Sequence, residues 1–216
     1  MVDPVKGRRP YDSSGRQAQA AQNRRAVMAA ASALFLGQGY GRTTITAIAA
    51  EAGVSPETVY ATFGSKAELL HRVWDVTIGG DDREVVFHER DEVQALFEEP
   101  DLRTRLMRHA ELSARTAQRI GPFLLMVQSA AGAEPAAGAM LEEMGRQRLV
   151  GMGVMAAAAA ATGQLAVSEE ECRDVVWSTT DGLLWHRLVH ERGWSQARFA
   201  TWLGRLWVGA LVDPRP

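Results

Sequence analysis

The chain has very little cysteine and no long hydrophobic run. Its 216 residues include a single cysteine, Cys172, which cannot form an internal disulfide. A lone thiol is typical of a reducing compartment and excludes a secreted scaffold held together by disulfides. Residues 1–10 lack the apolar segment of a signal peptide, and the longest apolar run, 150–161, is too short to span a bilayer. We therefore expect a cytoplasmic protein with no membrane span.

Glycine and proline are too sparse for a collagen-like or low-complexity chain, and a net charge of −2 is too small for a disordered one. With 46% hydrophobic residues, the chain can bury a sizeable core. The charge is unevenly distributed, because residues 1–72 sum to +4 and the remainder to −6. A basic N-terminal part joined to an acidic remainder suggests that only the first part meets a polyanion.

The periodicity of the apolar residues predicts an all-α fold. Apolar side chains recur at intervals of three and four, alanine is abundant, and no segment has a convincing strand pattern. In the first part we expect helices at 16–37, 44–52, 56–63 and 65–78. Beyond it we expect helices at 91–97, 102–119, 123–129, 136–161, 168–193 and 195–212. Pro100, Gly121 and Pro122 separate the earlier helices of this second set.

Residues 44–63 have the pattern of a helix-turn-helix, in which the second helix enters the major groove of DNA. Ser55 is a suitable N-cap, Pro56 a suitable first helical residue, and Ser65 and Glu68 have capping-box spacing. Backbone N–H groups at the helix starts near Thr44, Ser55 and Ser65 can face phosphates, because a helix N-terminus attracts anions.

Residues of this segment fall into two sets with different expected roles. One set holds the three-helix core, namely Ile48, Ala49, Val54, Val59 and Phe63. The other set is exposed on the second helix and would read bases, namely Pro56, Glu57, Thr58, Ala61 and Thr62. None of these is Arg, Lys, Asn or Gln, so the base preference stays open. Arg42 is a further candidate base reader. The arm with Lys6, Arg8, Arg9 and Arg16 either enters a minor groove or is simply solvated.

The stretch RRAVMAAASALFLGQGYGRTTITAIAAEAGVSPETVYATFGSKAELL resembles the DNA-binding domain of the tetracycline-repressor (TetR) family of bacterial regulators. The residues that carry the resemblance are Ala31, Phe35, Gly39, Thr43, Thr44, Ile48, Ala49, Ala52, Gly53, Val54, Ser55, Tyr60, Phe63, Ser65, Lys66 and Leu69. The resemblance implies that the Tyr60 hydroxyl contacts a phosphate and that Thr43 and Lys66 clamp the flanking backbone. Thr62 departs from the histidine expected there, which leaves one contact in doubt.

The same resemblance implies three parts, namely a basic arm over 1–15, a helix-turn-helix domain over 16–78, and a helical ligand-binding and dimerisation domain over 79–216. Large, soft side chains of the middle helices are pocket candidates, although a plain core would use them too. They are Phe123, Met126, Met144, Met152, Trp177, Asp181 and Trp185. The last helix is apolar on more than one face, which fits a subunit interface as well as a core helix. The interface candidates are Leu184, Leu188, Phe199, Trp202, Leu206 and Ala210.

We therefore predict a homodimeric repressor that binds an inverted-repeat DNA operator and is released by a small molecule. We expect no cofactor, no metal and no enzymatic activity, because nucleotide-binding, serine-hydrolase and zinc-protease motifs do not appear. The alternative is a helical enzyme, or a redox or metal sensor, without sequence-specific DNA binding. Cys172 and the His186/His190 pair at i, i+4 spacing are the residues that such an alternative would use.

Overall fold

The computed structural model describes residues 14–80 and 87–212, and every regular element in these ranges is helical, which confirms the predicted all-α fold. The N-terminal helices are α1 (Ser14–Gln38), α2 (Ile45–Ala52), α3 (Pro56–Phe63) and α4 (Lys66–Gly79). The C-terminal elements are η1 (Phe87–Glu89), α5 (Asp91–Phe97), α6 (Leu102–Ala131), α7 (Pro135–Ala160), α8 (Glu169–Thr179), α9 (Leu183–Trp185), η2 (His186–Glu191) and α10 (Gln196–Leu211). None of the described helices is long and apolar enough to cross a membrane.

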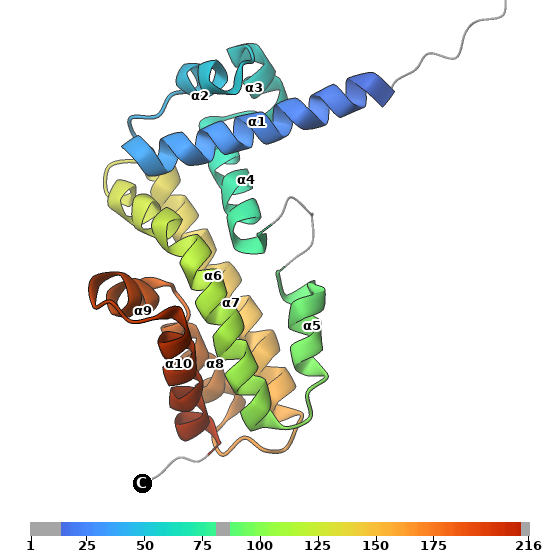
Figure 1. Cartoon of the computed structure of the whole chain (residues 1–216), viewed down its shortest axis with the longest axis vertical. Helices are drawn as coiled ribbons and strands as arrows, with labels where there is room; N and C mark the ends of the chain where they lie inside the picture. Colours follow the sequence, from blue (N-terminus) through green and yellow to red (C-terminus); the bar gives the residue numbers. More distant parts are fainter. Residues whose placement is uncertain (1–13, 81–86, 213–216) are drawn as a thin grey trace, which may run out of the picture.

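Three of the four N-terminal helices begin where the sequence places their caps. Thr44, Ser55 and Ser65 precede α2, α3 and α4, and each side-chain oxygen accepts a hydrogen bond from the backbone N–H three residues further on. Gly53 ends α2 with a φ of 68°, a left-handed conformation that glycine adopts without strain. The α2–α3 pair lies across one side of α1, and α4 runs from α3 towards the C-terminal helices (Figure 1).

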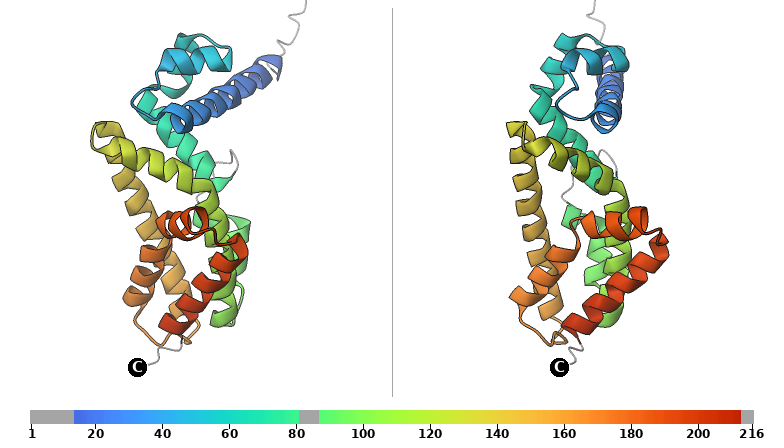
Figure 2. Two further views of the ribbon diagram at one scale, coloured as in Figure 1. Left: turned by 60° about the vertical axis from the view of Figure 1, so that its left-hand side comes forward. Right: turned by 90° about the vertical axis from the view of Figure 1, so that its left-hand side faces the viewer.

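The C-terminal part is built around two long antiparallel helices, α6 and α7 (Figures 1 and 2). α10 packs against α6, α8 packs against α7, and α5 lies against α6 on another side. The α6–α10 contact is close because Gly204 has no side chain. A Cβ atom at this position would lie 2.5 Å from the Met107 sulfur and 3.2 Å from the Met107 Cα. Trp207 is fully buried nearby and donates a hydrogen bond of 2.9 Å to the Thr179 hydroxyl of α8.

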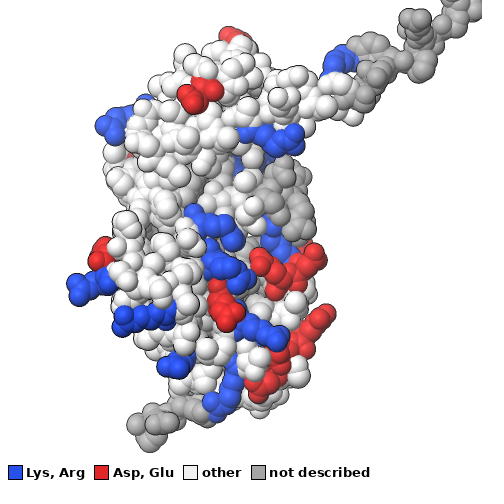
Figure 3. Space-filling model, in the orientation of Figure 1, with Lys and Arg blue, Asp and Glu red and all other residues white. Residues whose placement is uncertain are grey.

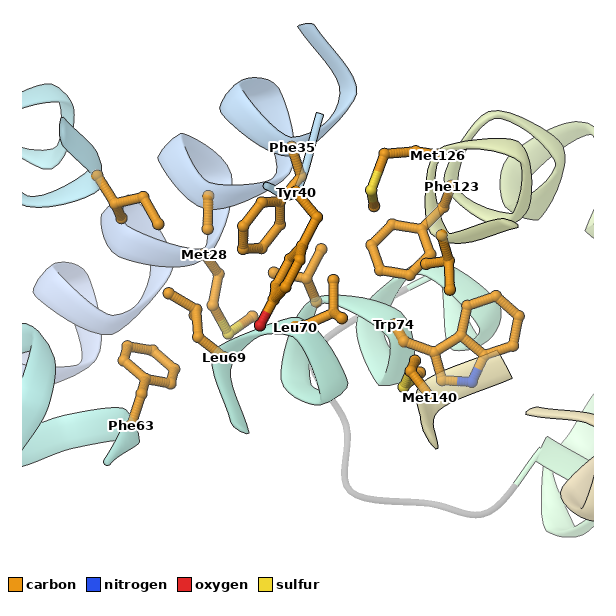
Figure 4. Close-up of a cluster of buried hydrophobic side chains, with 14 of the residues drawn as sticks. Met28, Phe35, Tyr40, Phe63, Leu69, Leu70, Trp74, Phe123, Met126 and Met140 are labelled. Carbon is orange, nitrogen blue, oxygen red and sulfur yellow. The ribbon is translucent and has the colours of Figure 1, made fainter. Parts of the chain in front are cut away.

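One buried cluster joins the N-terminal helices to α6 and α7 without interruption. In Figure 4 the side chains of α1 and α4 meet those of α6, and the rings of Trp74 and Phe123 are 5.7 Å apart. A second cluster fills the space between α6, α7, α8 and α10. The division into two parts at residue 78 stays a prediction. Hydrophobic side chains pack across this boundary, so we expect a displacement of α6 or α7 to shift α4 as well.

The two helices predicted at 102–119 and 123–129 are one helix, so this prediction was wrong. α6 continues through Gly121 and Pro122 and bends in its middle (Figure 2). Proline removes one hydrogen bond and disfavours a helix interior. Here the neighbouring side chains Ile120, Phe123 and Leu124 are all buried, and Pro122 itself is exposed. Tertiary burial therefore maintains the helix, and the proline bends it rather than ending it.

The helix predicted over 168–193 is interrupted, which is a second correction. α8 ends at Thr179, and Gly182 adopts a φ of 87° before α9 begins. The Asp181 carboxylate accepts a hydrogen bond of 2.9 Å from the backbone N–H of Leu183, so it caps the new start. The chain then continues as a π-helical segment, η2, rather than as a regular α-helix. This break turns α9 and η2 away from the direction of α8 (Figure 2).

Candidate DNA-binding surface and ligand cavity

The second helix of the helix-turn-helix, α3, has one buried face and one exposed face. Val59 and Phe63 are buried against α1, α2 and α4, together with Ile48 and Ala49 of α2. Tyr60 leaves 54% of its surface exposed. The predicted base-reading residues divide into two groups. Glu57, Ala61 and Thr62 are exposed, whereas Pro56 and Thr58 are half-buried. Val54 is half-buried and packs on the same cluster.

Hydrogen bonds at the start of α3 fix several of these polar groups. The Ser55 hydroxyl accepts from the Thr58 backbone N–H at 3.2 Å and lies 3.1 Å from the Thr58 hydroxyl. The Thr62 hydroxyl donates to the Thr58 carbonyl at 2.7 Å, so its methyl group is the part left for outward contact. A hydrogen bond from its own backbone N–H, and then one from the Ser55 hydroxyl, lowers the pKa of Glu57. Its carboxylate is therefore an acceptor at neutral pH, as a cytosine amino group requires.

Thr43 is buried and makes hydrogen bonds within the protein, and its contact with phosphate stays a prediction. Only 1% of Thr43 is exposed. Its hydroxyl donates towards the Gly39 carbonyl at 2.8 Å and lies 3.2 Å from the Leu34 carbonyl. The Gln38 amide in turn donates to this hydroxyl at 3.3 Å. A small side chain with both donor and acceptor fits this buried corner, so Thr43 closes the turn after α1.

Lys66 joins the beginning of α4 to the same turn. Its ammonium donates to the Tyr40 carbonyl at 3.0 Å and to the Thr43 carbonyl at 3.1 Å. The Nζ atom also lies 4.1 Å from the centre of the Tyr40 ring, a cation–π geometry. Two of the three ammonium donors are thereby directed at the protein, and the side chain is half-buried. Lys66 thus fixes the turn between α1 and α2, and its contact with phosphate stays a prediction.

The remaining predicted DNA contacts surround this turn. Arg42 is exposed, and its Nε donates to the Gln38 carbonyl at 2.7 Å. Thr44 is exposed and accepts from the Ala47 N–H at 3.1 Å, while the half-buried Ser65 accepts from the Glu68 N–H at 3.1 Å. Of the predicted basic arm, Arg16 is exposed on α1, whereas Lys6, Arg8 and Arg9 lie outside the described residues.

A cavity of about 1040 Å³ lies between the two parts of the molecule. Its walls come from α1, α4, α5, α6 and α7, and from the turn after α8. The volume suits a drug-sized molecule. Most of the apolar lining is flexible or branched aliphatic, and includes Met28, Ile78, Leu112, Leu124, Met144, Met152 and Met155. The cavity therefore contacts α1 and α4, which pack against the helices of the helix-turn-helix, α2 and α3.

Some of the pocket candidates predicted from the sequence line the cavity, and others lie outside it. Met144, Met152 and Asp181 line the cavity. Phe123 and Met126 do not, because they pack in the cluster shared with α1 and α4 (Figure 4). Trp185 lies against Gly121 and donates to the Gln196 side chain at 2.6 Å. Trp177 lies beneath the Arg148 guanidinium, whose carbon is 4.9 Å from the ring centre.

The sequence analysis did not single out two polar lining residues, Trp74 and His109. Each is 4% exposed, and the indole Nε1 and imidazole Nδ1 have no hydrogen-bond partner among the described residues. Burial lowers the pKa of His109 to about 4, so this imidazole is neutral at physiological pH. The centre of its ring lies 5.0 Å from that of Trp207, and the two rings are tilted by 43°. The sequence did contain a signal for His109, because this histidine belongs to the apolar stripe of Leu102, Leu106 and Ala110, a pattern that indicates burial.

The last helix buries one face and leaves the other accessible. Phe199 is 1% exposed and belongs to the core, so it is not at a surface available to a second subunit. Leu206 is 39% exposed, and the other interface candidates, Leu184, Leu188, Trp202 and Ala210, are half-buried. These residues come from α9, η2 and α10, which adjoin one another. Burial of such a face by a symmetry-related copy stays a prediction.

The residues that the alternative function would need have unremarkable surroundings. Cys172 is buried, and burial, followed by the charge of Glu169, raises the pKa of its thiol to about 11. Such a thiol is protonated and unreactive. The rings of His186 and His190 are 4.7 Å apart, yet no group of three His, Cys, Asp or Glu side chains able to hold a metal occurs within residues 14–80 and 87–212.

Comparisons with known proteins agree with the geometry. Residues 27–73 match the family of bacterial regulatory proteins described as the tetR family. A structure from Mesorhizobium loti, assigned to the TetR family of transcriptional regulators, is 18% identical over 90% of this chain and 98% of its own, with a TM-score of 0.64. NalD, the secondary repressor of the MexAB-OprM multidrug efflux pump in Pseudomonas aeruginosa, is 19% identical over 91% of this chain and 100% of its own, with a TM-score of 0.60.

A third similar structure, the SmeT–triclosan complex, is 19% identical over 90% of this chain and 98% of its own, with a TM-score of 0.61. No functionally curated protein is similar enough to count as a relative. Residues 27–73 are thus similar to the tetR family of bacterial regulatory proteins, and the described chain has the fold of TetR-family transcriptional regulators. The resemblance found in the sequence is confirmed.

Proposed function

We propose that the protein is a homodimeric transcriptional repressor that binds an inverted-repeat operator through α3 and leaves it when a small molecule fills the interdomain cavity. The observation that carries the proposal is the position of this cavity. Its lining includes Arg24 and Met28 of α1 and Trp74 and Ile78 of α4, the two helices that support α3. A similar fold holds triclosan in the SmeT complex, which supports a ligand site in this architecture.

The helix α4 provides the physical link between ligand and DNA. Its first residue, Lys66, binds the turn before α2, and its last two turns contribute Trp74, Asp75 and Ile78 to the cavity. The far end of α4 is also held, because Arg119 donates to the Ile78 carbonyl at 3.0 Å. A ligand that prefers a different position of α4 changes the separation of the two α3 helices in a dimer. Typical coupling of this kind is about 1–3 kcal/mol, or roughly 5-fold to 150-fold in affinity.

Selection from a pool of random double-stranded DNA at near-physiological salt tests the proposal. The full chain is expected to enrich an inverted repeat whose half-sites lie about one helical turn, or a multiple of it, apart. Tyr60→Phe tests whether α3 is responsible, with Tyr40→Phe as a control that removes a hydroxyl from a residue only 3% exposed. Failure of the ligand-free protein to enrich any sequence would contradict the proposal.

A further inference from the structure

The cavity is unusually rich in cations for a site with so much apolar lining. Among the described residues that line it are six arginines and three acids. The arginines are Arg24, Arg25, Arg72, Arg90, Arg146 and Arg148, and the acids are Asp75, Glu143 and Asp181. Two histidines, His88 and His109, also line the cavity. With both histidines counted as neutral, the described lining residues carry a formal charge of +3. Figure 3 shows basic side chains over the middle of the face at the height of α4 and α5, with acidic side chains beside them.

Two of these arginines are removed from bulk water, where a charge acts most strongly. Arg90 is 4% exposed. Arg148 is half-buried over the Trp177 ring, and burial lowers the pKa of its guanidinium while the charge of Asp181 raises it. An arginine retains its proton under such conditions. The excess of arginines over acids among the described lining residues favours a negative group over a positive one in the cavity.

A residue with a buried hydrogen-bond donor, Trp74, also lines the cavity. The Trp74 indole is packed at 5.7 Å against Phe123, and in Figure 4 its nitrogen lies on the side of the ring away from Phe123. This buried Nε1 lacks a hydrogen-bond partner among the described residues, and an indole N–H can only donate. Buried polar groups are almost always satisfied, so an acceptor atom of a bound molecule is the natural partner.

We propose that the cavity binds an apolar organic acid, with an aliphatic or aromatic body against the methionines and leucines and an anionic oxygen acceptor that meets the arginine-rich wall and the Trp74 N–H. The inference rests on the proposed function in one respect, namely that the bound acid acts as the effector that releases the DNA. The preference for an anion is a property of the cavity itself. It can be measured without DNA, so its failure and a failure of the regulatory function are distinguishable.

Three probes of equal chain length separate the contribution of charge from that of apolar area. Decanoate, 1-decanol and decyltrimethylammonium are titrated into the full chain at pH 7.5, below their micelle concentrations, with binding followed by calorimetry and tryptophan fluorescence. Decanoate is expected to bind at least 10-fold more tightly than decyltrimethylammonium and more tightly than 1-decanol. Equal affinities for all three, tighter binding of the cation, or no binding of decanoate would overturn the proposal.

Two variants assign the effect to named groups. Trp74→Phe retains an aromatic ring but removes the N–H, and is expected to weaken decanoate binding about 5-fold. The matched control, Trp194→Phe, changes a half-buried residue just before α10 that lies outside the cavity lining, and is expected to leave the affinity unchanged. Arg148→Gln is expected to reduce the ratio between the affinities for decanoate and decyltrimethylammonium. If Trp74→Phe and Arg148→Gln both retain the wild-type affinity for decanoate and the wild-type preference for the anion, decanoate does not bind at these residues and the proposal is wrong.

A separate measurement tests whether binding of the acid regulates binding of DNA. Decanoate at saturation is expected to weaken binding of the selected operator duplex, measured by fluorescence anisotropy. Preferential binding of decanoate with unchanged operator affinity supports the cavity assignment and contradicts its role as an effector site. An operator that is bound while decanoate is not would overturn the acid assignment and leave the DNA-binding function in place.

Discussion

Replacing Lys66 with methionine tests the strongest polar link between the start of α4 and the rest of the helix-turn-helix. The change retains an unbranched side chain but removes both charge-assisted hydrogen bonds to the Tyr40 and Thr43 carbonyls and the cation–π contact with Tyr40. Hydrogen bonds to charged groups contribute about 1.5–3 kcal/mol each, and a cation–π contact about 0.5–1 kcal/mol. Because the site is half-buried, water recovers part of this loss, and we expect a destabilisation of about 2–3 kcal/mol.

The assay is urea unfolding, followed by circular dichroism at one fixed protein concentration, since the stability of an oligomer depends on concentration. Arg72→Met is the control, because Arg72 is an exposed cation of the same helix that forms a surface ion pair with Asp75 at 3.9 Å. Surface pairs of this kind contribute about 0–1 kcal/mol. If Lys66→Met and Arg72→Met unfold at the same urea concentration as the wild type, the ammonium is solvated and the Lys66 link does not hold the turn.

Three further outcomes are expected. Tyr60→Phe should weaken binding to all DNA sequences several-fold without altering stability, measured by anisotropy and urea unfolding, because it removes one exposed hydroxyl. The pKa of His109 is about 4 in the native state against 6.5 as its ordinary value. Stability should therefore be constant above pH 6.5 and fall by about 3 kcal/mol as the pH approaches 4, and His109→Leu should flatten this dependence. Because its thiol is buried with a raised pKa of about 11, Cys172 should react with Ellman's reagent at pH 8 only after unfolding in urea.

The sequence predicted the N-terminal helices because their determinants are local. Thr44, Ser55 and Ser65 are caps whose effect spans three residues, and Gly53 occupies a backbone conformation that favours glycine. The outward position of Tyr60 followed from the same spacing. The burial of Thr43 did not, because it depends on Gly39 and Leu34, which meet its hydroxyl only once α1 and the following turn have packed.

The C-terminal part was harder to predict because packing there overrides local preference. Pro122 signals a helix end, yet the burial of Phe123 and Leu124 maintains α6 across it. The cavity could not be separated from the core by composition, since Met126 and Met144 look alike in the sequence and only the latter lines the cavity. Which of two equivalent side chains faces a void is decided by how the helices cross.

The most direct test of the regulator is the mass and affinity of its complex with the selected duplex. We would compare the full inverted repeat with a duplex that carries one intact and one scrambled half-site, by native mass spectrometry and anisotropy at near-physiological salt. The account predicts an even number of subunits on the full repeat and a much weaker complex on the single half-site, because both α3 helices must reach the major groove. One subunit bound equally well to either duplex would contradict it.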